Sequence, residues 1–302
     1  MKSKVTPYIA LFIGVFALST SAIFVRLADA PSAIVAFYRL FFTAIMLMPF
    51  LIFNKSAKSE LKSLSKKDWL IGALSGVFLS MHYVLWFESL KYTSVASSIV
   101  IVTLQPLFSI VGGFFIFKER IAKKAIFGSF IAIVGSMIIG WGDFQISNEA
   151  LFGDLLAFIA AGIITAYFFT GQHLRKNLSV ISYSLIGYVS SSIFLAIYAY
   201  VQGASFTNYP LKTWQLFIGL AFVATILGQF TFNWLLKWLS TTVISMSIMG
   251  ETIGAVLLSY FILNESITIK QAFGIMFILV GIGIFLYNNR NVEDKSIEAS
   301  VG

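Results

Sequence analysis

Long apolar stretches alternate with short polar connectors along this chain. Ten stretches can be drawn, near residues 7–25, 33–53, 69–90, 95–117, 123–141, 152–173, 181–201, 213–236, 241–263 and 269–288. A helix rises about 1.5 Å per residue, so about 20 apolar residues cross a hydrocarbon core of about 30 Å. The pattern therefore predicts an all-α integral membrane protein with ten transmembrane helices.

Composition supports the membrane and excludes several other classes. Apolar residues make up 58% of the chain and charged residues 11%, with a mean hydropathy of +0.89. A soluble domain carries roughly a quarter charged residues. The net charge of +8 could suggest nucleic acid, but the Lys and Arg residues lie in the connectors, where they encode topology. We therefore expect membrane lipid and no nucleic acid as surroundings.

The sequence also predicts neither a metal site nor a cofactor nor enzymatic chemistry. There are no cysteines, and the two histidines lie in different halves of the chain. No His-Glu-x-x-His, Gly-x-Ser-x-Gly or P-loop pattern is present. An intramembrane enzyme and a non-transporting receptor remain only remote alternatives.

Basic residues are distributed unevenly between alternate connectors. With a cytoplasmic N-terminus, the connectors on the inner side carry sixteen of the 21 Lys and Arg residues and the outer connectors carry four. Arg39 lies within a predicted helix. This bias satisfies the positive-inside rule. It predicts cytoplasmic N- and C-termini in a multi-pass protein of the cytoplasmic membrane.

Two similar stretches, each long enough for two transmembrane helices, lie about half a chain apart. The first reads LKYTSVASSIVIVTLQPLFSIVGGFFIFKERIAKKAIFGSFIAIVGSMIIGW from Leu90, and the second reads LKWLSTTVISMSIMGETIGAVLLSYFILNESITIKQAFGIMFILVGIGIFL from Leu236. Without a gap, the first copy aligns with the second at these positions: Lys91 with Lys237, Gln105 with Glu251, Glu119 with Glu265, Gly128 with Gly274 and Gly135 with Gly281. We predict five-helix repeats at 1–149 and 150–288, and a polar cytoplasmic tail at 289–302 that is disordered.

An odd number of helices per repeat requires the second repeat to insert upside down. The connector KERIAKK of the first copy carries four basic residues and is predicted to face inward, whereas its counterpart NESITIK carries one and is predicted to face outward. Inverted-topology repeats place the substrate site near the bilayer midplane, between the repeats.

The chain resembles the EamA-type permeases of the drug/metabolite transporter (DMT) superfamily over essentially its whole length. The resemblance is carried by the two five-helix halves, by VASSIVIVTLQPLFSIVGGFFIFKER with a Gly-punctuated fifth helix, and by MGETIGAVLLSYFILNES. Where the family usually has Glu-Pro, this chain has Glu251-Thr252. The resemblance implies export of small metabolites, often amino acids and related compounds and sometimes toxic cations.

Two polar residues lie about ten residues into their helices, close to the midplane: Gln105 and Glu251. An ionised carboxylate at that depth costs at least about 2.5–3.5 kcal/mol. Glu251 is therefore either a protonated or paired carboxyl that holds helices together, or a substrate contact and proton-coupling group. Gln105 either lines a cavity or forms a hydrogen bond between helices.

Further polar residues recur at helical spacing. These stripes favour a polar central cavity, although packing between helices is the alternative. The residues are His82 and Trp86; Ser98 with Gln105; Thr225, Gln229 and Asn233; and Ser247 with Glu251. His82 aligns with Gln229 if one gap is allowed.

Three charged residues near the helix ends complete the candidate set. Arg39 either snorkels or pairs with Asp29, or it attracts a carboxylate-bearing substrate near an external gate. Glu119 and Glu265 are expected to be end-caps or closure contacts at opposite membrane faces.

Together these features predict a secondary transporter that exports a small metabolite by alternating access, with possible proton coupling through Glu251. Its partners are a small-molecule substrate, protons if coupled, and lipid. The open alternatives are an uncoupled uniporter of the same fold and an efflux pump for drugs or organic cations. The sequence leaves the oligomeric state undetermined.

Overall fold

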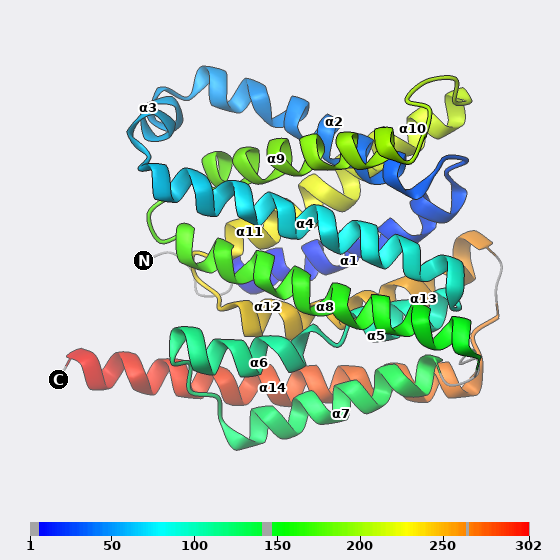
Figure 1. The fold of residues 1–302 in the computed structure, drawn as a ribbon. Coiled ribbons are helices and arrows are strands. Elements are labelled where there is room, and N and C mark those ends of the chain that lie inside the picture. The colour runs from blue at the N-terminus through cyan, green and yellow to red at the C-terminus, as the bar shows by residue number, and fades with distance from the viewer. Residues whose placement is uncertain (1–5, 141–146, 264–265, 302) are drawn as a thin grey trace.

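The protein consists of helices that pack side by side as one bundle (Figure 1). The computed structural model describes residues 6–140, 147–263 and 266–301. Within these residues, ten helical spans are long and apolar enough to cross a membrane. They match the ten predicted stretches to within a few residues at each end, so the predicted fold class is confirmed.

In its described residues, the first half contains seven helices, one of them short and polar. Their bounds are α1 (Thr6–Leu27), α2 (Ser32–Phe53), α3 (Lys55–Ser63), α4 (Lys66–Tyr92), α5 (Val95–Val102), α6 (Gln105–Phe117) and α7 (Lys123–Gly140). The second half contains α8 (Asn148–Leu174), α9 (Val180–Val201), α10 (Leu211–Gly219), the π-helix η1 (Leu220–Phe230), α11 (Thr231–Leu235), α12 (Thr241–Ile248), α13 (Gly250–Leu263) and α14 (Ile269–Val301).

Serine residues mark where many of these helices begin. In each case the serine hydroxyl accepts a hydrogen bond from the backbone N–H three residues later, at the N-terminus of α4, α5, α8, α9 and α12. Such a cap satisfies one of the free N–H groups of the first turn and stabilises a helix by about 1 kcal/mol. The serines are Ser65, Ser94, Ser147, Ser179 and Ser240.

The fourth and ninth spans are each broken at positions that the repeat relates. The fourth is interrupted at Thr103 and Leu104, between α5 and α6, and the ninth at Met249, between α12 and α13. Pro106 follows the first break, whereas Thr252 occupies that place after the second. The Thr252 N–H donates to the Met249 carbonyl at 3.3 Å, so the break forms without proline. Gln105 and Glu251 therefore both lie in the first turn of a half-helix.

The eighth span changes helix type in its middle. Eleven residues, Leu220–Phe230, form a π-helix between α10 and α11. Its counterpart in the first half, α4, is α-helical throughout. A π-helix has more residues per turn than an α-helix. The two spans therefore cannot keep one register, in agreement with the gap needed to align His82 with Gln229.

Helices of one half pack mainly on helices of the other. The helix α4 contacts α8 and α9, α2 contacts α9, and α1 contacts η1 and α13. The equivalent helices α7 and α14 lie side by side in Figure 1 and run antiparallel, with Gly128 against Gly281 and Gly135 against Gly274. The interface between the halves therefore runs through the centre of the bundle.

The two ends of the bundle carry different features. At one end, which we name the α3 end, lie α3 and the C-terminal part of α14 (Figure 1). The other, the α10 end, holds the first turns of α10. The charge bias predicts that the α3 end is cytoplasmic.

The helix α14 runs to Val301 and so through most of the segment 289–302, for which the sequence predicts disorder. No Gly or Pro interrupts the sequence between Asn288 and Ser300, which is compatible with a helix there, and the disorder of this tail stays a prediction.

Candidate functional site

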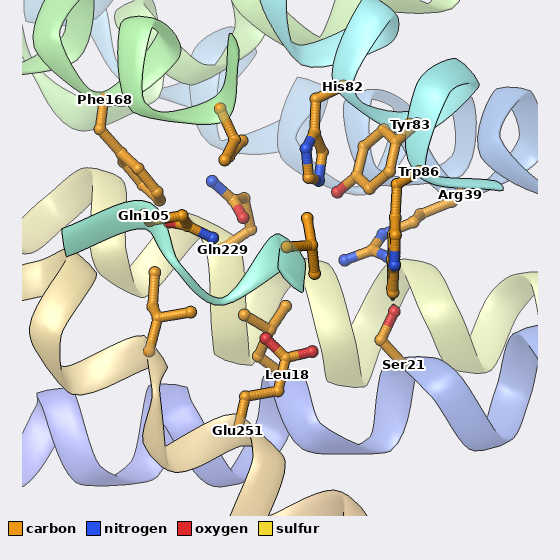
Figure 2. A pocket seen from close by; sticks show the side chains of 13 residues that line it. Leu18, Ser21, Arg39, His82, Tyr83, Trp86, Gln105, Phe168, Gln229 and Glu251 are labelled. Carbon is orange, nitrogen blue, oxygen red and sulfur yellow. Dashed lines mark hydrogen bonds between the residues drawn. The ribbon is translucent and has the colours of Figure 1, made fainter. Parts of the chain in front are cut away.

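A small cavity lies between the two halves, near the middle of the bundle. It is lined by both repeats, through α1, α2, α4 and α5–α6 from the first and α8, η1 and α12–α13 from the second. Figure 2 shows the lining side chains converging from these helices. The lining residues are Leu18, Ser21, Arg39, His82, Tyr83, Trp86, Val102, Gln105, Ile164, Phe168, Gln229, Ile248 and Glu251.

Arg39 is the cation of this cavity. Its side chain is 1% exposed, and it is held from two sides: Nε donates to the Thr225 hydroxyl at 2.9 Å and Nη1 to the Ser21 hydroxyl at 2.7 Å. The guanidinium also lies 4.8 Å from the centre of the Tyr83 ring. Arg39 therefore neither snorkels to the surface nor pairs with Asp29. It is fixed between helices of both halves.

Glu251 points into the same cavity from α13 (Figure 2). Both side chains belong to the described part of the chain, yet they form no ion pair within 4.0 Å. Glu251 also has no hydrogen-bond partner among the described residues. One cation and one acid therefore border the cavity without neutralising each other directly.

Four polar atoms around the cavity lack a hydrogen-bond partner within the protein. They are three donors, Arg39 Nη2, Trp86 Nε1 and Gln229 Nε2, and one acceptor, Gln105 Oε1. They make up half of the eight buried, unpaired side-chain atoms among the described residues. A buried polar group without a partner costs about 1–3 kcal/mol, so such a concentration at one place needs an explanation. A ligand with hydrogen-bonding groups would supply one.

Positions related by the repeat meet at this cavity. Gln105 and Glu251 line it, and so do His82 and Gln229. The His82 Nδ1 is bonded to the Ala160 carbonyl at 3.1 Å, which fixes the ring against α8. The cavity thus lies where the two inverted repeats face each other, the position expected for a substrate site.

Six of the ten residues expected to line a cavity do so: Arg39, His82, Trp86, Gln105, Gln229 and Glu251. The other four, Ser98, Thr225, Asn233 and Ser247, do not line this cavity and lie elsewhere in the helix packing. Ser98 bonds Ser89 at 2.6 Å, and Ser247 donates to the Val243 carbonyl in its own helix. The Thr225 hydroxyl accepts a hydrogen bond from Arg39 Nε. One polar stripe on a helix can face a cavity at some positions and neighbouring helices at others. These four residues lie at positions of the second kind.

Asn233 belongs to a separate buried polar network. Its amide nitrogen donates to Tyr167 at 2.7 Å, to Ser184 at 3.0 Å and to Tyr188 at 3.2 Å. This network ties α11 to α8 and α9 and satisfies all its members shown here. It acts as packing between helices, one of the alternatives left open for such stripes.

Sequence patterns did not point to several lining residues. Ser21 belongs to no recognisable pattern of polar residues at helical spacing. The lining residues Val102 and Ile248 are apolar, like most other residues of their spans. Only the position of Tyr83, next to His82 in the sequence, offered a weak hint.

At the α3 end, Glu119 connects the two halves. It accepts hydrogen bonds from Gln172 Nε2 and from the Thr242 hydroxyl, both at 2.8 Å. Gln172 in turn accepts from the Thr241 N–H at 2.7 Å. The connector after α6 is thereby bound to α8 and α12. Glu265, the predicted counterpart of Glu119, lies outside the described residues.

Comparison with known proteins identifies the architecture. The model of the EamA-like transporter family matches residues 5–141 and again residues 151–287. The chain belongs to the EamA-like transporter family. It is therefore a multi-pass membrane transporter built from two EamA units, and it is not an enzyme.

Relatives of this transporter share its length but have low identity. The chain is 23% identical to the uncharacterized transporter YyaM of Bacillus subtilis, over 88% of this chain and 89% of the relative. It is 24% identical to the S-adenosylmethionine uptake transporter of Rickettsia prowazekii, over 88% and 86%. A crystal structure with 15% identity superimposes with a TM-score of 0.81, covering 95% of this chain and all of the other, and shows that the fold is shared.

Proposed function

We propose that this chain is a secondary transporter that exports an amino acid or a related small metabolite across the cytoplasmic membrane by alternating access. The observation that carries the proposal is the concentration of unpaired polar atoms, one cation and one acid around a cavity between the halves. A zwitterion matches this set, because its carboxylate needs donors and its ammonium needs an acceptor.

In this proposal each lining residue has a defined task. Arg39 binds the substrate carboxylate through Nη2, which is the part of its guanidinium left free by Ser21 and Thr225. Trp86 and Gln229 add neutral donors, and Glu251 accepts from the ammonium or, with the cavity unloaded, carries a proton. Exchange of substrate for proton on one carboxylate is a direct way to couple the two fluxes.

The size of the cavity supports alternating access. Its volume is about 30 Å³, enough for a few water molecules, whereas sites for small ligands occupy about 300–1,000 Å³. Substrate binding therefore requires the surrounding helices to move. The main packing contacts join one half to the other, so a rocking motion of the halves would enlarge this space.

The Rickettsia relative supports the substrate class, since S-adenosylmethionine is an amino-acid derivative, although that protein is named for uptake. The test is counterflow in proteoliposomes with amino acids and with the amines that lack only the carboxylate. We expect amino acids to exchange at least about ten times faster, and Arg39→Ala to abolish the difference. Equal exchange of amines and organic cations would favour the cation-efflux alternative. To separate export from uptake, the transporter is reconstituted in one known orientation, and substrate flux is measured with the substrate gradient applied in each direction.

A further inference from the structure

A second cavity lies next to the central one. It has a volume of about 210 Å³ and lies nearer the α10 end, where α1 ends at Leu27. We name it the outer pocket. Its lining residues are Ala22, Val25, Arg26, Trp86, Leu90 and Ile99.

Trp86 is the one residue that belongs to the linings of both the central cavity and the outer pocket, as the described residues have them. We propose that the Trp86 side chain is the gate that separates the substrate cavity from the α10 end. This inference rests on the proposed function, because it assigns the route by which that cavity opens.

The spacing of the lining residues shows that the two cavities follow one another along the same groove. On α4, Trp86 lies one turn beyond His82, and Leu90 lies one turn beyond Trp86. On α1, Leu18 lines the central cavity and Ala22, one turn later, lines the outer pocket. Residues four apart lie on the same face of a helix, about 6 Å further along it. The same faces of α1 and α4 therefore line both spaces in turn.

The contacts of the Trp86 side chain allow it to rotate. Its indole lies 5.9 Å from the His82 ring, nearly parallel at 21°, and 5.1 Å from the Phe87 ring. It is 6% exposed, but its Nε1–H has no partner within the protein. Rotation of the indole therefore breaks ring packing and no hydrogen bond. A substrate acceptor bound to Nε1 would couple occupancy of the cavity to the position of the ring.

The α3 end is closed in a different way. There, Glu119 holds the halves together through Gln172 and Thr242, which are on α8 and α12. Opening that end breaks hydrogen bonds between the halves. The α10 end is bridged as well, because the Thr93 and Ser97 hydroxyls donate to the Asp154 carboxylate on α8 at 2.8 and 2.9 Å. The halves are thus bound to each other at both ends, and Trp86 lies between the central cavity and the outer pocket.

Thiol labelling tests the gate without any substrate. The chain contains no cysteine, so single-cysteine variants can be used directly. Val102→Cys reports on the central cavity and Ala22→Cys on the outer pocket. A membrane-impermeant maleimide is added to membrane vesicles of known orientation, from each face separately.

From the face of the α10 end, we expect Ala22→Cys to react in all backgrounds. Val102→Cys should react slowly when Trp86 is present. It should react at least about ten times faster when Trp86→Ala is combined with it. The control is Trp69→Ala, because Trp69 lies on the same helix, is 44% exposed and lines neither cavity. It should leave the rate at Val102→Cys unchanged. If Trp86→Ala does not yield a monodisperse protein, Trp86→Leu replaces it.

Equal labelling of Val102→Cys with and without the Trp86 ring would overturn the gate. So would faster labelling from the α3 end only, or an Ala22→Cys that does not react from the α10 end. Because labelling needs no transport, a clear gating result combined with failed amino-acid counterflow would reject the proposed function and keep the gate. The reverse pair of results would reject the gate alone.

Discussion

A Cβ atom added to Gly128 would lie 2.7 Å from the carbonyl oxygen of Gly281. The repeat aligns Gly128 with Gly274 and Gly135 with Gly281, but the contacts are crossed: Gly128 meets Gly281, and Gly135 meets Gly274 at the same 2.7 Å. Crossed contacts between equivalent residues arise when two similar helices pack antiparallel around a two-fold axis. The antiparallel packing of the last helix of each repeat, α7 and α14, is therefore the arrangement expected for inverted repeats.

The first prediction concerns this packing. Gly281→Ala places its methyl 2.5 Å from the Gly128 carbonyl oxygen, so α7 and α14 must separate. We expect a loss of about 1–3 kcal/mol, as for other overpacked contacts, measured as a lower midpoint of thermal unfolding in detergent. Gly283→Ala is the matched control, since nothing lies within 4 Å of its added carbon. Equal effects of the two variants would contradict the packing.

The second prediction separates the charge of Arg39 from its geometry. Lysine keeps the charge but cannot hold Ser21 and Thr225 while offering a further donor to the cavity. We expect Arg39→Lys to lower the transport efficiency of a carboxylate substrate about ten-fold or more, equivalent to at least about 1.4 kcal/mol. Lys212→Gln, at an exposed lysine in the first turn of α10, is the control. Wild-type efficiency in Arg39→Lys would remove Arg39 from substrate binding.

The third prediction concerns coupling through Glu251. Glutamine preserves the shape of the side chain but cannot exchange a proton, so flux driven by a pH gradient should disappear while exchange without a gradient persists. The measurement is substrate flux in proteoliposomes with and without the gradient, comparing Glu251→Gln and Glu251→Asp. Gradient-driven flux that survives in Glu251→Gln would point to a uniporter or to coupling at another residue.

The fourth prediction concerns closure at the α3 end. Gly113 leaves room for Glu119, because a Cβ there would lie 2.8 Å from Glu119 Oε2 and 3.1 Å from the Thr242 hydroxyl. Both Gly113→Ala and Glu119→Gln should therefore loosen this end and raise labelling of Val102→Cys from the α3 face several-fold. Glu88→Gln serves as the control, since Glu88 forms a surface ion pair with Lys91 on α4. Unchanged labelling would make Glu119 an end-cap only.

The fifth prediction concerns the surface helix α3. The Glu60 carboxylate accepts from the Ser179 N–H at 2.6 Å and also from the Ser179 and Ser182 hydroxyls, so it binds the N-terminus of α9. A carboxylate at that position is favoured by the helix dipole and by charge-assisted hydrogen bonds. Glu60→Ala should cost about 1–3 kcal/mol of stability. Lys58→Ala, on the same helix and exposed, should be nearly neutral in the same thermal assay.

Hydropathy, charge and the alignment of the chain with itself were sufficient to predict ten spans, two repeats and their expected inversion. These properties are local, because each span must by itself carry about 20 apolar residues and each connector its own charge. The alignment of Gln105 with Glu251 likewise needed no coordinates. It located two residues that the structure then places in the first turns of half-helices around one cavity.

Which polar side chains face that cavity was decided only by the tertiary structure. Gln229 and Asn233 share one helical stripe, yet Gln229 lines the cavity while Asn233 binds three residues on α8 and α9. Ser21 carried no signal, but it holds Arg39 in place. Helical spacing gives the face of one helix, whereas a site depends on which faces of several helices meet. The breaks in two spans and the π-helix in a third change which side chains point toward the cavity. Which of these helix faces meet is determined by the packing between the halves.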